Sequence, residues 1–311
     1  MVTNEDNYIR FDWAMKRLLR NKANYVVLEG FLSSLLGKKF KIHRFLESES
    51  NQEDEDDKYN RVDILAESEN EQLCIIEVQN SREQTYFHRM LYGVSKAITE
   101  YIGLGKPYEA VRKVYSINIV YFELGQGKDY VYHGKTEFVG EHEPHDTLKL
   151  SIRQNEKFFG IKDDKLELRK SPGDLFPEYY ILRVNDFDKV ATTPLDEWIE
   201  FLKTGSISSK ATAAGLPEAR ERLRVDSLSQ KDKQAYFRHL EAVRHMKSLF
   251  DTSRDEGYQE GIIKGEAKGR AEGEKEKAKE IALKLLALNT PIDIIFQSTG
   301  LSIEEIKKLK S

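Results

Sequence analysis

The most informative pattern of this chain lies in residues 61–79, RVDILAESENEQLCIIEVQ. Two runs rich in Val, Ile and Leu flank a short polar turn at residues 68–70, and this pattern predicts a β-hairpin. The first run carries Asp63, and the second carries Glu77 and Gln79. Alternate side chains on a strand point to the same face, so Glu77 and Gln79 are expected to project side by side.

The two acids of this hairpin sit inside apolar strands, where a carboxylate costs free energy unless it is paired or binds a metal. Asp63 and Glu77 lie on strands that are expected to pair, with the Gln79 amide beside them. Hard oxygen ligands of this kind suit Mg²⁺. The competing interpretation is that Asp63 and Glu77 lie on the solvated face of an antiparallel pair. The hairpin alone leaves both interpretations open.

The bulk composition is that of a globular protein with a highly charged surface. The chain has 311 residues, of which 33% are charged and 39% hydrophobic, enough for one sizeable domain plus appendages. A net charge of −4 argues against a uniformly basic nucleic-acid binder, although local basic patches remain compatible with it. The single cysteine, Cys74, excludes an internal disulfide and favours a reducing compartment. Without a leader or a membrane-spanning run, the sequence predicts a cytoplasmic protein.

The segments on either side of the hairpin read as helices that could add to the same site. Residues 12–36 predict two helices closed by Gly37, and Glu29 lies among their apolar positions. Glu29 is either a third metal-binding acid or an ordinary surface acid. The helix after Gln79 is predicted to bury Phe87, Leu91, Val94, Ile98 and Tyr101. Arg89 and Lys96 would then lie on the opposite face, to meet phosphates or simply solvent.

The segment 114–123 is a β-branched and aromatic run that predicts a strand buried on both faces. Strand, helix and strand in this order predict a crossover connection, and hence an α/β sandwich with a small mixed sheet. Residues 130–138 and 147–152 are predicted as edge strands, and residues 196–202 as the end of a helix. His133, His142 and His145 have no regular ligand spacing and are interpreted as surface histidines.

The C-terminal third is predicted to be helical in three parts. Residues 206–250 read as a basic extension. Residues 251–280 carry glycine every four residues, at 257, 261, 265, 269 and 273, which favours a helical stalk that self-associates. Residues 281–311 read as a small module in which Pro291 starts one helix, Gly300 ends it, and Ser302 with Glu305 forms a capping box for the next. DNA reading and oligomer packing are both open for this module.

With these elements in order, the chain resembles the PD-(D/E)XK nuclease superfamily, and within it the recombination-promoting nuclease (Rpn), YhgA-like transposase family. The resemblance spans nearly the whole chain. It rests on FDWAMKRLLR and NYVVLEGFLSSLLG, on RVDILAE followed by CIIEVQ, on PLDEWIEFLKTG, and on the glycine-rich stalk with LLALNTPIDIIFQSTGLSIEEIKKL. It implies a restriction-endonuclease-like α/β core over residues 1–205, with a mixed sheet flanked by helices, followed by the three helical parts.

The resemblance further implies a Mg²⁺-dependent DNA endonuclease of low sequence specificity, linked to recombination or transposition. Asp63 and Glu77 match the metal-binding acids, and Glu29 matches a helix-borne acid. Gln79 stands where many relatives carry lysine. An amide can orient water but cannot act as a base, so the general base is unassigned, and Arg89 and Lys96 are the candidates to replace the lysine charge. DNA and a second copy of the chain, joined through the C-terminal helices, are the expected partners.

A second function belongs to another class: a catalytically inactive DNA-binding or oligomerising protein that keeps the nuclease fold. Gln79 and the negative net charge favour it, whereas the intact pair Asp63 and Glu77 opposes it. A toxin or phage-defence effector would share the nuclease mechanism and differ only in its biological role.

Overall fold

The computed structural model describes residues 8–17, 19, 21–46, 63–102, 107–161 and 170–310. The chain divides into two compact units, Met1–Leu240 and Glu241–Ser311. The acidic run at residues 47–57, residues 61–62 of the hairpin stretch, and the glycines at 103 and 105 lie outside the described residues.

The first unit is built on a mixed six-stranded sheet with the strand order β1-β2-β3-β4-β6-β5. The strands are β1 (Ile42–Leu46), β2 (Ile64–Ser68), β3 (Leu73–Gln79), β4 (Val114–Val120), β5 (Val131–Gly134) and β6 (Glu178–Arg183). The β2–β3 pair is the predicted antiparallel hairpin. Strands β3, β4 and β6 run parallel, and β5 closes the far edge antiparallel to β6. The predicted α/β fold with a mixed sheet is confirmed.

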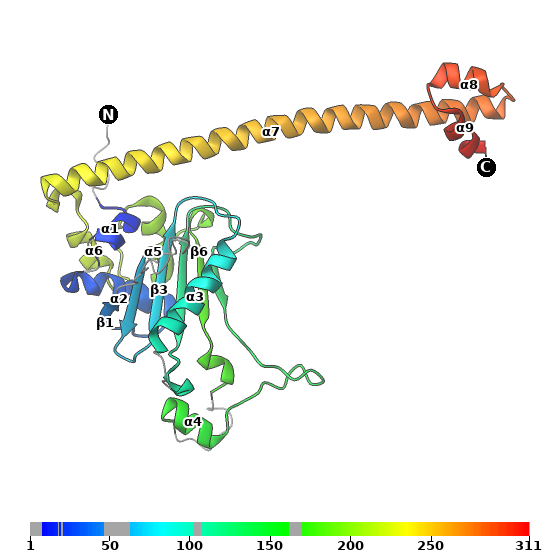
Figure 1. Ribbon diagram of the computed structural model, residues 1–311. Coiled ribbons are helices and arrows are strands. Elements are labelled where there is room, and N and C mark those ends of the chain that lie inside the picture. The colour runs from blue at the N-terminus through cyan, green and yellow to red at the C-terminus, as the bar shows by residue number, and fades with distance from the viewer. Residues whose placement is uncertain are drawn as a thin grey trace. The chain divides into compact units, whose positions relative to one another are not determined.

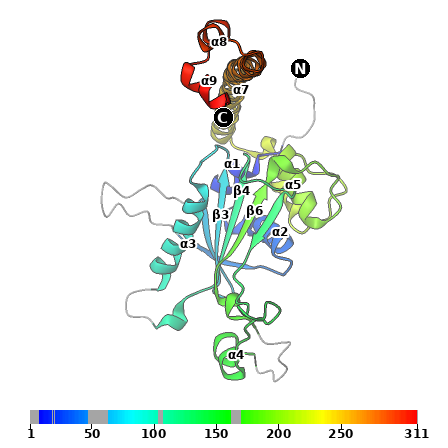
Figure 2. The ribbon, with the colours of Figure 1, turned by 90° about the vertical axis from the view of Figure 1, so that its right-hand side faces the viewer.

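Helices cover both faces of this sheet (Figure 1). Helix α3 (Tyr86–Ile102) lies on one face, and α1 (Phe11–Arg17), α2 (Tyr25–Leu36) and α5 (Pro194–Thr204) lie on the other, as Figure 2 shows edge-on. The larger core lies under α1, α2 and α5. Phe11 contacts Phe31, Trp198 and Phe201 edge-to-face with ring centroids 5.5 to 6.2 Å apart. Such geometry stabilises aromatic cores beyond their buried area.

Local signals explain how several helices begin and end. Gly37 ends α2 with φ of 62°, the left-handed conformation that glycine tolerates best. Helix α5 covers the segment predicted from residues 196–202, and a capping box of Thr193 with Asp196 opens it. Gly30 in α2 faces the Ala214 carbonyl so closely that a Cβ would overlap it. This close approach seats α6 (Leu216–Arg222) against α2.

The buried face of α3 differs from the sequence expectation at its start, where Tyr86 and Met90 are buried and Phe87 is 51% and Leu91 59% exposed. Further along, Val94 is buried as expected, and Ile98 and Tyr101 pack against its cluster. Two neighbouring rows of this helix are about equally apolar, so spacing alone does not choose between them. The buried row is the one in which the Tyr86 hydroxyl reaches the sheet.

The expected edge strands are also corrected. The segment 130–138 contains only the short strand β5. Residues 147–152 form no strand: they contribute one isolated bridge, Val139 to Thr147, and the start of α4 (Ile152–Phe159), opened by a capping box of Ser151 with Gln154. Strand β6 was not predicted, because its sequence EYYILR has no clear alternation. Short 3-10 turns complete the unit at Lys22–Asn24, Tyr108–Ala110, Pro172–Leu175, Val184–Asp186 and Val225–Ser227.

The core of the first unit continues beyond residue 205. Leu216, Leu223 and Tyr236 all belong to the large hydrophobic cluster, and Tyr236 lies near the start of α7 (Gln230–Ala287). The Trp13 ring contacts that of Tyr236 edge-to-face at 5.4 Å. The division into parts ending at 205, 250 and 280 stays a prediction, but any fragment that keeps this core intact must include the first turns of α7.

The second unit contains the rest of α7 together with α8 (Ile292–Thr299) and α9 (Ile303–Lys310). Its small core consists of Ala282, Ile295, Leu301 and Ile306. Gly300 ends α8 with φ of 70°, and Ser302 and Glu305 form the expected reciprocal capping contacts. Pro291 caps α8 rather than occupying its first position. None of the helices that the structure describes is long and apolar enough to cross a membrane.

Candidate functional site

The hairpin places Asp63 beside Glu77 at the carboxyl end of β3. Ile64 pairs with Ile76 in the antiparallel register, so Asp63, one residue earlier, lies next to Glu77. The Val78 amide donates a hydrogen bond of 2.8 Å to Asp63 Oδ2. Residues opposite each other in an antiparallel pair share a face, and here that face is the one covered by α3. Two carboxylates therefore meet at one end of the hairpin.

Glu77 is a buried acid in an unusual electrostatic state. Its side chain is nearly inaccessible, with 4% of the residue exposed, and within the described part of the chain no donor hydrogen-bonds its Oε2. Burial raises the pKa of Glu77 to about 7; the charge of Arg89 acts against this shift, while Asp63 and Glu83 add to it. A buried carboxylate oxygen without a donor is the kind of group that a bound cation would satisfy.

Arg89 is a basic residue that contacts Glu77. From α3, its Nε lies 3.3 Å from Glu77 Oε2, and its Nη1 donates to Glu83 Oε2 at 3.2 Å. Lys96 lies two turns further along α3, about 10 Å away at 1.5 Å per residue, and pairs with Glu100 at 3.6 Å. The structure therefore brings Arg89, and not Lys96, to the hairpin acids.

Gln79 ends β3 two residues after Glu77 and is partly exposed. Its carbonyl accepts a hydrogen bond of 3.0 Å from the Tyr121 amide, which holds the strand end in place. Alternation along β3 puts its side chain on the same face as that of Glu77. The amide is thus positioned to contact whatever the two carboxylates bind.

Glu29 is not brought to the other acids. It is a buried residue of α2 whose carboxylate accepts from the Ile42 amide at 3.0 Å and pairs with Lys41. Ile42 pairs with Ser68, at the opposite end of β2 from Asp63. Five strand residues at about 3.3 Å each separate the two ends by roughly 16 Å. Glu29 fixes the start of β1 instead.

The buried polar side chains of Asn118 and Tyr86 lie next to Glu77, and the sequence analysis did not identify them. Asn118 on β4 is the register partner of Glu77, and the Tyr86 hydroxyl donates to Asn118 Oδ1 at 3.1 Å. Asn118 Nδ2 donates in turn to the carbonyls of Ser116 and Tyr180, at 3.2 Å each. The signal was present: an asparagine in the middle of the apolar run VYSINIV needs partners once buried.

Asp12 is another buried acid, and the sequence analysis did not identify it as a candidate. It accepts hydrogen bonds from Arg10 Nε at 3.2 Å and Asn80 Nδ2 at 3.1 Å, and from His239 Nε2 at 3.0 Å when that nitrogen carries the proton. Burial acts to raise the pKa of Asp12, but the His239 and Asn80 hydrogen bonds and the Arg10 charge hold it well below its usual range. Asn80 directly follows Gln79, so this cluster abuts the end of β3.

The donor set at the end of the hairpin fits a divalent cation with oxygen ligands. It offers the Asp63 and Glu77 carboxylates as ligands, with the Gln79 amide on the same face to orient a water, and the Glu77 Oε2 atom is buried without a hydrogen bond among the described residues. Among the residues that the structure describes, no cluster of three or more His, Cys, Asp or Glu side chains is arranged to hold a metal. Two carboxylates are hard oxygen ligands of the kind that bind a divalent cation which keeps several waters.

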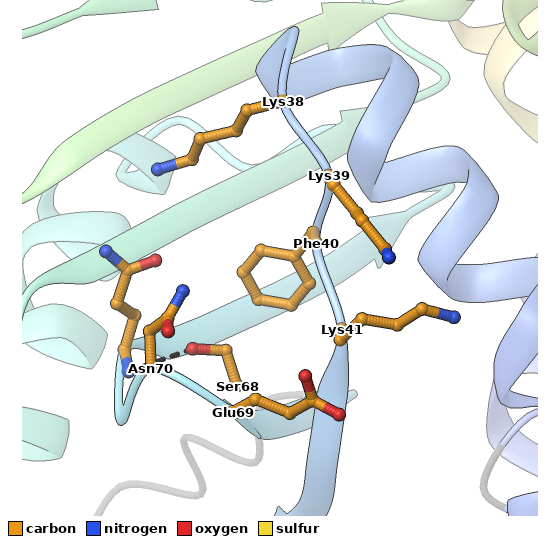
Figure 3. Close-up of a pocket in the computed structure, with 8 residues that line it drawn as sticks. Lys38, Lys39, Phe40, Lys41, Ser68, Glu69 and Asn70 are labelled. Carbon is orange, nitrogen blue, oxygen red and sulfur yellow. Dashed lines mark hydrogen bonds between the residues drawn. The ribbon is translucent and has the colours of Figure 1, made fainter.

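Three histidines that the sequence brought to notice, and one cavity, lie elsewhere. His133 stacks on Tyr180 and contacts Glu178 at 2.9 Å, and His142 and His145 are exposed. A cavity of about 210 Å³ lies between the segment before β1 and the β2–β3 turn, and Figure 3 draws the residues that line it. Its Lys38 donates to the Tyr115 hydroxyl and its Lys41 pairs with Glu29. It lies at the Ser68 end of β2, away from Asp63.

Comparison with known proteins identifies one family. The family described as PD-(D/E)XK nuclease family transposase matches residues 9–158, a region that runs from α1 into α4 and contains Asp63, Glu77, Gln79 and Arg89. No curated protein and no solved structure matches the chain.

Proposed function

Since residues 9–158 belong to the PD-(D/E)XK nuclease family transposases, we propose that the protein is a Mg²⁺-dependent DNA endonuclease of low sequence specificity that acts in recombination or transposition. The observation that carries the proposal is the placement of Asp63 beside Glu77, whose buried Oε2 has no hydrogen-bond donor within the described residues. A cytoplasmic location and self-association through the C-terminal helices stay predictions.

The reaction is hydrolysis of a phosphodiester, in which a water oxygen bonds to phosphorus and one P–O ester bond breaks, leaving a phosphate monoester and a hydroxyl. Bound by Asp63 and Glu77, Mg²⁺ would polarise the phosphate and lower the pKa of the attacking water. The Val78 amide holds Asp63 in place. Gln79 orients the water by hydrogen bonding but takes no proton, because an amide is not a base.

Plasmid cleavage tests this proposal. We expect the full chain to nick or linearise supercoiled DNA with Mg²⁺ and to be inactive in EDTA. D63N and E77Q should be inactive, because each replaces a metal-binding carboxylate by a neutral group of the same shape. The control is D188N, which changes an exposed acid of the same unit and should cut normally. An intact plasmid at high enzyme concentration, with Mn²⁺ also tried, would refute the hydrolytic proposal.

The alternative is an inactive protein that binds DNA or oligomerises. Two observations favour it. Gln79 is an uncharged amide at the position where many relatives carry lysine, and Arg89 already neutralises part of the Glu77 charge. Fluorescence anisotropy with labelled DNA separates the two functions. DNA binding that persists without Mg²⁺, together with an uncut plasmid, would support the alternative.

A further inference from the structure

The contact between Arg89 and Glu77 is close but poorly directed. Arg89 Nε and Glu77 Oε2 are 3.3 Å apart, yet both atoms are buried and neither makes a hydrogen bond within the described part of the chain. Well-formed arginine–carboxylate pairs are bidentate, with N–O distances near 2.8 Å. The guanidinium therefore supplies charge to Glu77 without the hydrogen bonds that would fix it there.

Arg89 also has a second partner outside the metal-binding pair. Its Nη1 donates to Glu83 Oε2 at 3.2 Å, and the Glu83 side chain is 31% exposed. If the contact with Glu77 breaks, Glu83 still holds the guanidinium at the edge of the site. Arg89 can then turn its Nε toward another anion without entering bulk solvent.

A positive group beside Glu77 is favourable whenever this carboxylate is ionised. Asp63 and Glu77 lie side by side, and Arg89 contacts both Glu77 and a third acid, Glu83. Adjacent carboxylates repel each other unless a cation lies between them. A divalent cation bound to Asp63 and Glu77 would in turn repel Arg89, because like charges at this range interact strongly in a buried site.

We propose that Arg89 is a built-in substitute for the metal: it neutralises Glu77 in the metal-free protein, competes with Mg²⁺ for this carboxylate, and on displacement binds the DNA phosphate with its freed Nε. This inference rests on the proposed function and adds a regulation of the same site. It makes productive metal binding dependent on DNA, since the phosphate gives the displaced guanidinium a new anionic partner.

Cation affinity measured without DNA tests the competition. Mg²⁺ is titrated by calorimetry into the full chain and into R89M, which keeps the apolar stem but not the charge, in the same buffer at several pH values. We expect the Kd to fall about tenfold in R89M, because a competing positive charge is removed. K96M, on the same helix but away from Glu77, is the matched control and should bind as the wild type does. D63N should abolish binding.

An unchanged or higher Kd in R89M would overturn the competition. If R89M proves unfolded by circular dichroism, R89Q is titrated instead with the same expectation. Plasmid cleavage then separates this inference from the proposed function. R89M is expected to cut poorly despite its tighter cation binding, because the phosphate contact is lost. If the wild type cleaves DNA but the Kd is unchanged in R89M, only the proposed competition between Arg89 and Mg²⁺ is refuted. If R89M binds Mg²⁺ more tightly but no form cleaves DNA, only the proposed nuclease activity is refuted.

Discussion

Asp12 on α1 and His239 on α7 are 227 residues apart in sequence, yet the imidazole Nε2 lies 3.0 Å from the buried Asp12 carboxylate. With Asn80 bonded to the same carboxylate at 3.1 Å, the contact ties the first turns of α7 to the end of the strand that carries Glu77 and Gln79. The nuclease-like unit is therefore completed by residues that lie well beyond the region matching the family.

The Asp12 contact predicts an acid-sensitive stability. The pKa of Asp12 is lowered in the folded chain, so its contribution is present above the unfolded value, near pH 4, and is lost as pH falls below it. D12N should destabilise the first unit by about 3 kcal/mol at pH 7, and this loss should shrink steadily as the pH is lowered from about 4 toward about 2. Urea unfolding at several pH values, followed by the fluorescence of the buried Trp13 and Trp198, measures the trend. A loss that stays the same down to about pH 2 would contradict the assignment.

The raised pKa of Glu77 predicts the opposite pH dependence of stability in the metal-free protein. Its pKa is raised from 4.5 to about 7, so burying the acid costs nothing below pH 4 and reaches its full cost above pH 7. In EDTA, E77Q should be more stable than the wild type at pH 8, by up to about 3 kcal/mol, and equally stable at pH 4. Thermal unfolding at the two pH values checks this. A loss of stability at pH 8 would show that Glu77 is stabilised by its surroundings.

Gln79 predicts a defect in turnover without a defect in metal binding. In Q79A the two carboxylates are retained but the group that orients water is removed, so kcat for plasmid cleavage should fall about tenfold, within the range for positioned hydrogen-bonding groups. The Mg²⁺ Kd should change little. Single-turnover cleavage and calorimetry measure the two quantities. A Kd that rises in step with the loss of kcat would make Gln79 a metal ligand instead.

The Tyr86–Asn118 hydrogen bond predicts a non-additive pair of substitutions. Y86F leaves the buried Asn118 Oδ1 without its donor and should cost about 2 kcal/mol. In N118L the Tyr86 hydroxyl loses its acceptor at a similar cost. The double variant should lose clearly less than the sum of the two, because neither partner is then left unsatisfied. Additive losses in denaturant unfolding would show that the two side chains act independently.

The sequence was sufficient for the parts of the fold that local patterns encode. The hairpin acids, the crossover through α3 and the buried strand β4 all follow from apolar runs with polar residues at defined steps. The rotation of α3 did not follow, because two apolar rows compete and the Tyr86 hydroxyl decides between them. The Asp12–His239 contact could not follow, since no local pattern relates residues so far apart.

The charge pattern of the sequence did not show which charged residues belong to the site. Arg89 and Lys96 look alike on the helix, and only the register of α3 against the hairpin shows that Arg89 contacts Glu77. Glu29 has the burial expected of a functional acid, but the Lys41 and Ile42 contacts account for it. The chemistry of such side chains depends on which neighbours the fold supplies.

The five glycines of α7, at 257, 261, 265, 269 and 273, have no atom of the described chain near the position that a Cβ would take. Each weakens the helix by roughly 1 kcal/mol relative to alanine, with no packing inside the chain to offset it. We expect this stretch of the 58-residue helix to unwind more readily than the same helix with alanine at these five positions. Fully unwound, residues 257–273 would lengthen from 1.5 Å to about 3.4 Å each, a gain of roughly 30 Å. When the ends of this helix are pulled apart, the glycine stretch is therefore expected to lengthen before the rest of α7.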